Sequence, residues 1–440
     1  MSVSKCRAQS ALRAAVYCGL ILGHCYVATA KTLCVAPTPA SGSGCYATIG
    51  AAVSAASAND TVNIGAGEYA EDVIITKPLA LVGAGAGASI INAHGLANGI
   101  YVDGLDNAGL SHVLVTGLTV IDANYEGILV TNTSNSFISN NHVANNDQSL
   151  NYAAGMCAGE PVFETNEGED CGEGIHLVGV DHITVANNVV ELNSGGILLS
   201  DETGMTFEVE IVGNVVRDNA LDCGITLASH PPSPQASSKL PYGIFNNTIV
   251  GNIVSSNGLV GGGAGVGIFA PGPGNMNFGN KVIGNTIENN GLPGVTVHNH
   301  ASPAGAPGIN LNDLVIIGNY ISGNGADTED ATTPGTTGIN IYSVGPAYAT
   351  EILENTIVNE AVDVVMNNPG GMQVHLNNLL GGGIGVNNLG KGSVDASMNY
   401  FGCSGGPGTT GCSTVTGSTL ISAPFLSAPV VSASAPRGRQ

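Results

Sequence analysis

Apolar and polar positions repeat along the chain in one two-part pattern. Residues 282–287 read Val-Ile-Gly-Asn-Thr-Ile, and residues 294–297, after a short turn, read Gly-Val-Thr-Val. Because alternate residues of a strand point to opposite sides, each part predicts a short strand with its Ile and Val facing one way. We expect the chain to bend at the Asn of the first part. This Asn recurs as Asn188, Asn214, Asn252, Asn319 and Asn355.

The spacing of the pattern predicts how the strands are arranged. The shortest spacing is about 22 residues, as from Gly174 to Gly196, and longer spacings add an insertion. A repeat of this length with several β-branched strands predicts a solenoid, because one coil cannot bury its own apolar side chains until the next coil covers it. We interpret the recurring Asn as a structural ladder, since Asn tolerates a left-handed backbone and its amides can stack at the ~4.8 Å strand spacing.

The first part of the chain carries a specific resemblance. Residues 47–53 form an amphipathic segment, residues 60–69 a strand that ends in a Gly-Glu-Tyr turn, and residues 73–85 a second strand before Gly-rich sequence. This order resembles the opening of secreted right-handed parallel β-helix proteins of the pectin-lyase-like superfamily, including its NosD-like and carbohydrate-associated repeat groups. The resemblance implies an all-β right-handed parallel β-helix with a capping helix at 47–58. It implies no single activity, because the superfamily holds lyases, hydrolases, esterases, epimerases and proteins without known activity.

The two ends of the chain differ in composition from the repeats. Residues 1–30 have a basic start, an apolar run and a small-residue site, which predicts a secretory signal peptide cleaved after Ala30. Residues 31–426 are expected to form one domain, closed by a turn at 399–412 that resembles the last turn of such proteins. Residues 427–440 are rich in Ser, Ala and Pro, so we expect a disordered tail. The protein is therefore expected to be secreted or periplasmic.

The net charge of the chain limits the classes of partner that it is expected to bind. The formal net charge is −22, and it becomes −25 without residues 1–30, which carry three positive and no negative charges. So acidic a protein is not expected to bind nucleic acid or anionic membranes, and a polyanionic substrate would need a cation to mediate. No apolar run after the signal peptide is long enough to span a membrane. We expect a monomer.

Seven cysteines follow the signal peptide. In an oxidising compartment, local spacing predicts three short disulfide loops. Cys223 is then left over, and we interpret it as a buried small apolar residue. The expected pairs are Cys34–Cys45, Cys157–Cys171 and Cys403–Cys412.

Insertions interrupt the repeat at two places, before and after the Gly-led strand of each coil. Long loops on both edges of one sheet form the walls of a groove, so a ligand is expected on the outer face of these strands. The insertions are residues 146–172, 258–265 and 325–337 before the strand, and 229–241, 271–277 and 300–308 after it. Counting two residues from each leading Gly predicts the outward row His176, Leu198, Thr226, Phe269, Thr296, Asn340 and Asp363.

Titratable residues cluster near this predicted groove. Two carboxylates can serve as general acid and base on a glycosidic bond, and a His can abstract a proton. We expect Asp201, Glu202 and Asp222 in the carboxylate roles, assisted by His176 or His230. The alternative is that these polar residues have no catalytic role and simply occupy exposed loop ends.

Two groups suggest metal ions. Crowded carboxylates offer the hard oxygen ligands of calcium, although a solvated acidic loop has the same composition. His298 and His300 lie on one face of a strand and, with His230, suggest a transition-metal site. The candidate calcium ligands are Glu167, Glu169, Asp170 and Glu173.

The sequence favours a polysaccharide ligand and leaves the activity open. The first hypothesis is a protein that cleaves or binds a polysaccharide, with neutral sugars and hydrolysis favoured by the low content of basic residues. Trp is absent, so sugar stacking would fall to Tyr242, Phe269 and Tyr342. The alternatives are a non-catalytic structural or adhesion protein, and a periplasmic copper-handling protein, as the NosD-like resemblance implies. The motifs of polygalacturonases and mannuronan epimerases are missing. A pectate lyase needs Arg or Lys to take the proton, and the central coils contain only Arg217, Lys239 and Lys281 as basic residues.

Overall fold

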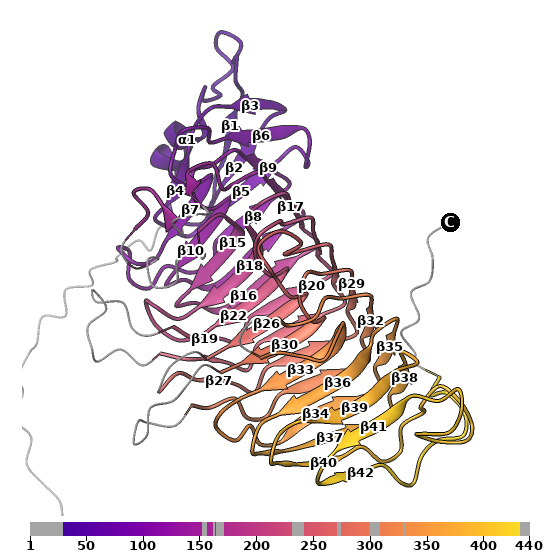
Figure 1. Cartoon of the computed structure of the whole chain (residues 1–440). Coiled ribbons are helices and arrows are strands. Elements are labelled where there is room, and N and C mark those ends of the chain that lie inside the picture. The colour runs from indigo at the N-terminus through magenta and orange to yellow at the C-terminus, as the bar shows by residue number, and fades with distance from the viewer. Residues whose placement is uncertain are drawn as a thin grey trace, which may run out of the picture.

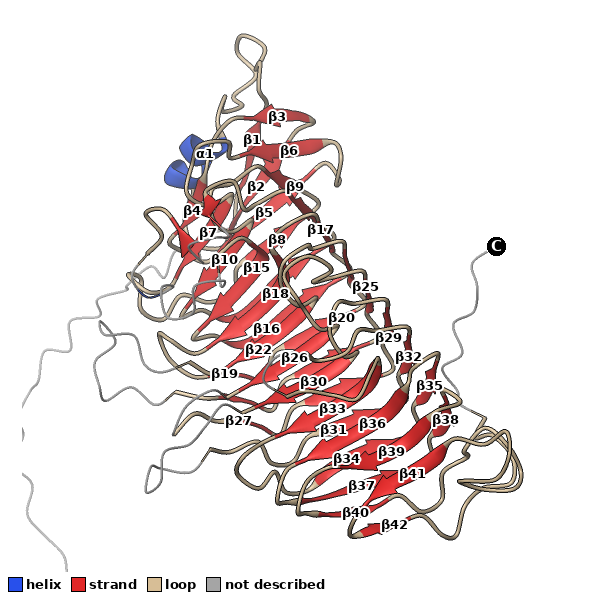
Figure 2. Cartoon of the chain, in the orientation of Figure 1, coloured by secondary structure: helices blue, strands red, loops and turns tan. Residues whose placement is uncertain are grey.

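The described chain is a long stack of coils built almost entirely from parallel strands (Figures 1 and 2). The structure, a computed structural model, describes residues 30–151, 156–161, 163, 171–230, 242–270, 274–299, 309–328 and 331–431. Three parallel sheets, named A, B and C below, run the length of the stack. The predicted signal peptide up to residue 29 and the tail from residue 432 lie outside the described residues.

The described strands divide among the sheets as follows. Sheet A contains β1 (Thr32–Val35), β2 (Asp60–Ile64), β5 (Leu79–Gly83), β8 (Leu114–Thr116), β11 (Ser134–Ser139), β16 (Asp181–Ala186), β19 (Thr206–Phe207), β20 (Glu210–Val212), β23 (Ile244–Phe245), β24 (Thr248–Val250), β27 (Asn277–Phe278), β28 (Lys281–Ile283), β31 (Val315–Ile317), β34 (Thr350–Leu353), β37 (Gly371–His375), β40 (Ser393–Asp395) and β42 (Leu420–Ile421). Sheet B contains β3 (Gly67–Tyr69), β6 (Ser89–Asn92), β9 (Thr119–Ile121), β12 (His142–Ala144), β17 (Val189–Glu191), β21 (Val215–Arg217), β25 (Ile253–Ser255), β29 (Thr286–Glu288), β32 (Tyr320–Ser322), β35 (Thr356–Val358) and β38 (Asn378–Leu380). Sheet C contains β4 (Val73–Ile75), β7 (Ile100–Asp103), β10 (Ile128–Thr131), β15 (Glu173–Val178), β18 (Gly195–Ser200), β22 (Ile225–Ala228), β26 (Val266–Phe269), β30 (Val295–His298), β33 (Thr337–Tyr342), β36 (Val362–Asn367), β39 (Ile384–Asn388) and β41 (Thr414–Gly417). A separate antiparallel pair consists of β13 (Leu150–Asn151) and β14 (Met156–Cys157).

Along most of the stack, each coil contributes a strand to each sheet and pairs in register with the next coil. In sheet C, Ile197 pairs with Ile225, which pairs with Val266 on the following coil. All three side chains are fully buried. Identical columns of Ile, Val and Leu therefore fill the inside of the stack, and each fully buried aliphatic side chain contributes about 1.5–3 kcal/mol. The apolar side chains of one coil are therefore covered by the coils next to it, as expected for a solenoid.

The predicted Asn ladder is present at the bend between sheets A and B. Asn252 donates from its backbone N–H and from its Nδ2 to Oδ1 of Asn285, both at 2.9 Å. The same pair of hydrogen bonds joins each Asn of the row to the next, and the whole row is buried. The ladder is Asn141, Asn188, Asn214, Asn252, Asn285, Asn319, Asn355, Asn377 and Asn399.

A second ladder, which was not predicted from the sequence, lies at the bend between sheets B and C. It repeats the same double hydrogen bond and ends on a carboxylate, since Asn324 donates to Oε1 of Glu360 from its backbone N–H and its Nδ2. The members are Asn146, Asn193, Asn219, Asn257, Asn290, Asn324 and Glu360.

We expected the ladder Asn to adopt the left-handed backbone at each bend. In the structure, the residue before it has this conformation. Gly284, which precedes Asn285, has φ 60°, and Leu376, which precedes Asn377, has φ 59°. The ladder Asn itself keeps an ordinary φ because its backbone N–H must point along the stack toward the next rung. Gly suits the left-handed position best, but the column also holds Asn, Glu, Leu and Met.

The helix expected at 47–58 is α1 (Ile49–Ala55). Its buried face consists of Ile49, Ala52 and Val53, which cover the first coil. Glu71 accepts from the backbone N–H groups of Ile49 and Gly50 at 2.7 and 2.9 Å. At the other end, Lys77 Nζ donates to the carbonyl of Ala56 at 2.9 Å. A carboxylate at the start and an ammonium at the end satisfy free backbone groups of this short helix.

The cysteine predictions hold. Disulfides join Cys34 to Cys45, Cys157 to Cys171 and Cys403 to Cys412. Cys223 is a buried free thiol, and burial raises its pKa well above the ordinary value, which makes it a poor nucleophile.

The C-terminal boundaries differ from the prediction. The expected closing turn at 399–412 is followed by β41 and β42, which pair with sheets C and A, so the stack continues beyond it. The tail predicted to be disordered from 427 is described as far as residue 431. Val430 exchanges two hydrogen bonds with the side chain of Asn378 at 2.8 and 3.0 Å. In the described residues, no helix has the length and apolar character that crossing a bilayer requires.

Candidate functional site

The outer face of sheet C carries the densest group of buried titratable side chains. Its strand register sets them in rows. His176, Leu198 and Thr226 follow one another on successive coils, and so do Ser200, Ala228 and Phe269. Each step along a row is one coil, ~4.8 Å. Polar residues at the carboxyl ends of these strands therefore stand side by side across coils.

Two of the row assignments were wrong. Phe269 pairs with Ala228 and His298, so it belongs to the row of Ser200, while Gly267 occupies the place between Thr226 and Thr296. The coil opens at Gly265, two residues earlier than counted. Asp363 likewise takes the place of a leading Gly, since Val365 is the partner of Asn340. Asp363 is fully buried, and its desolvation raises the pKa of its carboxyl well above the ordinary value.

Asp201 and the residues after β22 form the centre of the site. Asp201 Oδ2 accepts from Ser229 Oγ at 2.7 Å, and Oδ1 accepts from the backbone N–H of His230 at 2.7 Å. Burial, and secondarily the charge of Glu202, raise the pKa of Asp201 to about 7, although both hydrogen bonds oppose the shift. Near neutral pH this carboxyl is therefore partly protonated and can donate a proton.

Glu202 is held in the opposite state. Its Oε1 lies 2.5 Å from Nδ1 of His230, and its side chain is 2% exposed. Burial alone would raise the pKa of Glu202, but the charge and the hydrogen bond of His230 outweigh it and lower the pKa. Two adjacent carboxyls thus differ in protonation, which is the arrangement that acid and base catalysis requires.

His176 extends the cluster toward the N-terminal coils. Its Nε2 lies 2.7 Å from Ser200 Oγ, and its Nδ1 lies 4.0 Å from Oε1 of Glu126. Both His176 and Glu126 are fully buried. Desolvation lowers the pKa of His176 to about 4, so its imidazole is neutral at neutral pH. Ser200, Ser229 and Glu126 were not predicted as site residues, although Ser200 and Ser229 directly precede residues that were.

Asp222 is separate from this group. It lies directly before β22, at the opposite end of the strand from Ser229 and His230. Its charge and a side-chain hydrogen bond act on the thiol of Cys223. The structure therefore unites Asp201, Glu202, His176 and His230 and leaves Asp222 at the other edge of sheet C.

A second histidine–carboxylate pair lies further along the row. His298 Nε2 is 2.6 Å from Oδ2 of Asp327, which is fully buried. The ring of His298 stands at 79° to both Phe269 and Tyr342, with centroids 5.4 and 6.4 Å away. The two described histidines of the expected transition-metal site, His230 and His298, are bound to different carboxylates. His300 is outside the described residues.

The calcium prediction falls mainly outside the described residues, which exclude Glu167, Glu169 and Asp170. Glu173 is in β15 and 1% exposed. Among the described residues, one trio of metal-binding side chains lies close together, Cys157, Glu160 and Cys171. Its two cysteines form a disulfide, so they offer no thiolate.

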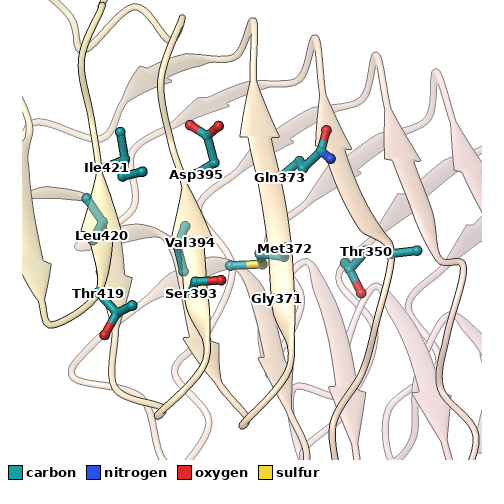
Figure 3. Close-up of a pocket in the computed structure, with 11 residues that line it drawn as sticks. Thr350, Gly371, Met372, Gln373, Ser393, Val394, Asp395, Thr419, Leu420 and Ile421 are labelled. Carbon is teal, nitrogen blue, oxygen red and sulfur yellow. The ribbon is translucent and has the colours of Figure 1, made fainter.

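Two cavities lie away from this cluster. One, of about 570 Å³, is on sheet A near the C-terminal end, where Figure 3 shows Gln373, Asp395 and Ile421 on three neighbouring strands. Asp395 pairs with His375 at 3.3 Å and is the one carboxylate lining it. The other, of about 480 Å³, adjoins Tyr342 at the ends of β33, β36 and β39.

The comparisons agree with this architecture. The family described as "Right handed beta helix region" matches residues 81–270. The fold is a right-handed parallel β-helix, as the sequence predicted. The comparison with curated proteins gave no match.

Similar solved structures were found at low identity. The A-module of the Azotobacter vinelandii mannuronan C-5 epimerase AlgE6 is 16% identical, with 86% of this chain and 93% of that chain covered and a TM-score of 0.46. The AlgE4 A-module from the same organism is 15% identical, covering 78% and 91%, with a TM-score of 0.45. An alginate lyase from Paenibacillus is 12% identical, covering 74% and 95%, with a TM-score of 0.42. Likeness at this level concerns the fold alone.

Proposed function

We propose that the protein is a secreted enzyme that cleaves a polysaccharide lying along the outer face of sheet C. The observation that carries this proposal is the pair of neighbouring buried carboxyls with opposite pKa shifts, Asp201 raised to about 7 and Glu202 lowered. Such a pair supplies a proton donor and a base within one site. Three disulfides support an oxidising compartment.

The chemistry assigned to the pair is hydrolysis. Asp201 donates its proton to the glycosidic oxygen as the bond from that oxygen to the anomeric carbon breaks. Glu202 accepts a proton from the water that attacks the anomeric carbon, and His230, whose Nδ1 lies 2.5 Å from Oε1, positions this carboxylate. The proton gained on the base side returns to Asp201 through solvent, so the site is restored after each cleavage. Ser229 positions Asp201 through the 2.7 Å hydrogen bond.

The test is incubation of the mature protein with a panel of plant and bacterial polysaccharides, with and without EDTA. New reducing ends without absorbance from unsaturated sugars are expected, and Asp201→Asn is expected to abolish them. Absorbance from unsaturated sugars would show elimination and overturn the hydrolytic roles. Absence of any product on every substrate would favour the structural or adhesion alternative. Loss of activity in EDTA would support the calcium site that includes Glu173.

A second candidate, removal of acyl groups from a polysaccharide, is favoured by a different contact. Ser200, His176 and Glu126 follow one another as hydroxyl, imidazole and carboxylate, at 2.7 and 4.0 Å. The same order of groups activates the nucleophilic serine of enzymes that attack an acyl carbon. Acetate release from acetylated xylan that is lost in Ser200→Ala, with glycosidic cleavage absent, would select this candidate.

A further inference from the structure

The cavity of about 480 Å³ beside Tyr342 lies on the same face of sheet C as the acid–base cluster. Ser200, Ala228, Phe269 and His298 occupy successive coils of one row. The ring of Tyr342 is next to that of His298, and Tyr342 pairs with Asn367 on the following coil. The cavity therefore begins about four coils, or ~19 Å, beyond Ser200 along the stack.

The walls of the cavity offer apolar surface. Tyr342 is half-buried, Pro369 is exposed, and Leu389 is 47% exposed, although sheet C is otherwise well covered. A pyranose ring has an apolar C–H face and polar edges. Its apolar face would lie on Tyr342, since aromatic rings bind such faces without needing a specific polar group.

Two hydrogen-bond donors, Asn368 and Lys391, are among the polar residues that line the cavity. Asn368 is 3% exposed, and its Oδ1 accepts from the backbone N–H of Gly370 at 2.8 Å. Its Nδ2 is buried without a hydrogen-bond partner, and Asn368 is one of the residues that line the cavity. Lys391 lines the exposed side, and no carboxylate of a described residue is within ion-pair distance of it. A buried amide donor that lacks a partner costs about 1–3 kcal/mol until a ligand supplies an acceptor.

We propose that this cavity is a binding subsite for a pyranose residue that carries a carboxylate, such as a hexuronate. The carboxylate accepts from Nδ2 of Asn368 and pairs with the ammonium of Lys391, while the ring lies against Tyr342. The inference rests on the proposed function in that the same polysaccharide passes the acid–base cluster. It narrows the substrate to a mainly neutral chain with spaced uronates, because a net charge of −22 repels a continuous polyanion.

The subsite is tested by binding rather than by turnover. Calorimetric titration of the mature protein compares methyl glucuronide with methyl glucoside. Lys391→Met removes the cation. Asn368→Asp keeps the acceptor for the backbone N–H of Gly370 but replaces the amide donor by a carboxylate, which repels the carboxylate of the sugar. Lys281→Met is the matched control, since Lys281 is an exposed lysine on sheet A.

We expect methyl glucuronide to bind at least about tenfold more tightly than methyl glucoside, the effect of one hydrogen bond to a charged group. Lys391→Met should remove this preference, Asn368→Asp should weaken the glucuronide by a further tenfold or so, and Lys281→Met should bind as the unmodified protein. Equal binding of the two sugars, or an unchanged preference in Lys391→Met, would overturn the proposal. If binding depends on Lys391 but no polysaccharide is cleaved, the subsite stands and the proposed enzymatic function fails.

Discussion

Asp201 and Glu202 are neighbours in sequence, yet their carboxyls face different partners. Asp201 accepts from a hydroxyl and a backbone N–H, both neutral, whereas Glu202 contacts the imidazole of His230. In a buried setting a neutral partner compensates a charge less than an ionic one does, so the pKa of Asp201 rises to about 7 and that of Glu202 falls. The division of roles between the two carboxyls follows from these contacts.

Asp201→Asn tests the proton donor. The Asn oxygen can still accept from the backbone N–H of His230, and its Nδ2 can donate to Ser229 Oγ, the reverse of the bond that Asp201 accepts. The amide cannot donate a proton to a glycosidic oxygen. We expect kcat to fall about 10²- to 10⁴-fold. In the unmodified protein kcat/KM should decline about tenfold per pH unit above about pH 7, as Asp201 loses its proton. Initial rates across pH on the substrate found in the panel measure both effects, with Asp313→Asn as an exposed control. A rate in Asp201→Asn close to that of the control would remove Asp201 from the mechanism.

A second residue-scale prediction concerns backbone conformation. Leu192 has φ 60° and is 52% exposed, so its side chain gives little packing in return for a left-handed backbone. We expect Leu192→Gly to be more stable than Leu192→Ala by about 1 kcal/mol, because only Gly adopts this conformation without the Cβ penalty. Thermal melts of the two variants measure the difference. A Gly variant that is no more stable than the Ala variant would show that the bend imposes no strain there.

The ladders are the elements that hold successive coils at one spacing. Each rung uses a backbone N–H, a side-chain amide and a carbonyl from the coil before, as Asn285 does with Asn319 and Ile249. These groups would otherwise be buried without partners at the tightest bends of the coil. Insertions of different length do not interrupt the ladder, because they begin and end at positions outside these two bends.

Asn285→Ala should destabilise the protein by about 2–4 kcal/mol, since it leaves several buried polar groups of neighbouring coils without partners. Asn63→Ala, at an exposed position of β2, is the control and should change stability by less than about 0.5 kcal/mol. Thermal melts compare the two. Equal effects would mean that the ladder amides contribute no more than surface amides.

The sequence allowed the first ladder to be predicted but not the second, for a physical reason. The first ladder Asn always lies between two apolar strands, so the pattern frames it. The second ladder is separated from the next strand by segments of different length and ends at Glu360, so no single motif marks it. The site was predictable only in part. Asp201, Glu202 and His230 stood out as titratable residues after strands, whereas Ser200 and Glu126 are common residue types that only coil register brings to His176.

At the scale of the whole molecule, one axis organises both stability and function. Figure 1 shows the sheets continuing from the capped N-terminal coil to β41 and β42. The acid–base cluster and the cavity beside Tyr342 lie on the same face of sheet C at different heights. A linear polymer parallel to the axis would meet both in turn, which a substrate crossing the coils would not.

Global stability should depend on pH through Glu360. Burial raises the pKa of Glu360 to about 7, despite hydrogen bonds from Asn324. The folded state therefore holds a proton that the unfolded chain releases near its ordinary value, so this contribution to stability is complete below about pH 4.5 and lost as pH rises through about 7. Glu360→Gln should be more stable than the unmodified protein above pH 7, by about 1–2 kcal/mol after allowance for partial solvation.

Calorimetric melts at pH 5 and pH 8 test this expectation. The difference in stability between Glu360→Gln and the unmodified protein should be larger at pH 8, because Glu360 is ionised there. Asp201 has the same pH dependence in both proteins, so its contribution cancels from the difference. Glu210→Gln, on an exposed position of β20, is the control. A constant difference at the two pH values would show that Glu360 ionises in the folded state as it does in the unfolded chain.

The second ladder has a direction. Every side-chain amide in it donates toward the higher-numbered coil, from Asn146 to Asn324. Six amide dipoles are thus aligned head to tail inside the stack, with their positive end at Glu360. The row acts on that carboxyl as the backbone of a helix acts on a charge at its terminus. Replacement of Asn324, the rung that donates to Glu360, would therefore change the electrostatic potential at that carboxyl without any movement of the backbone.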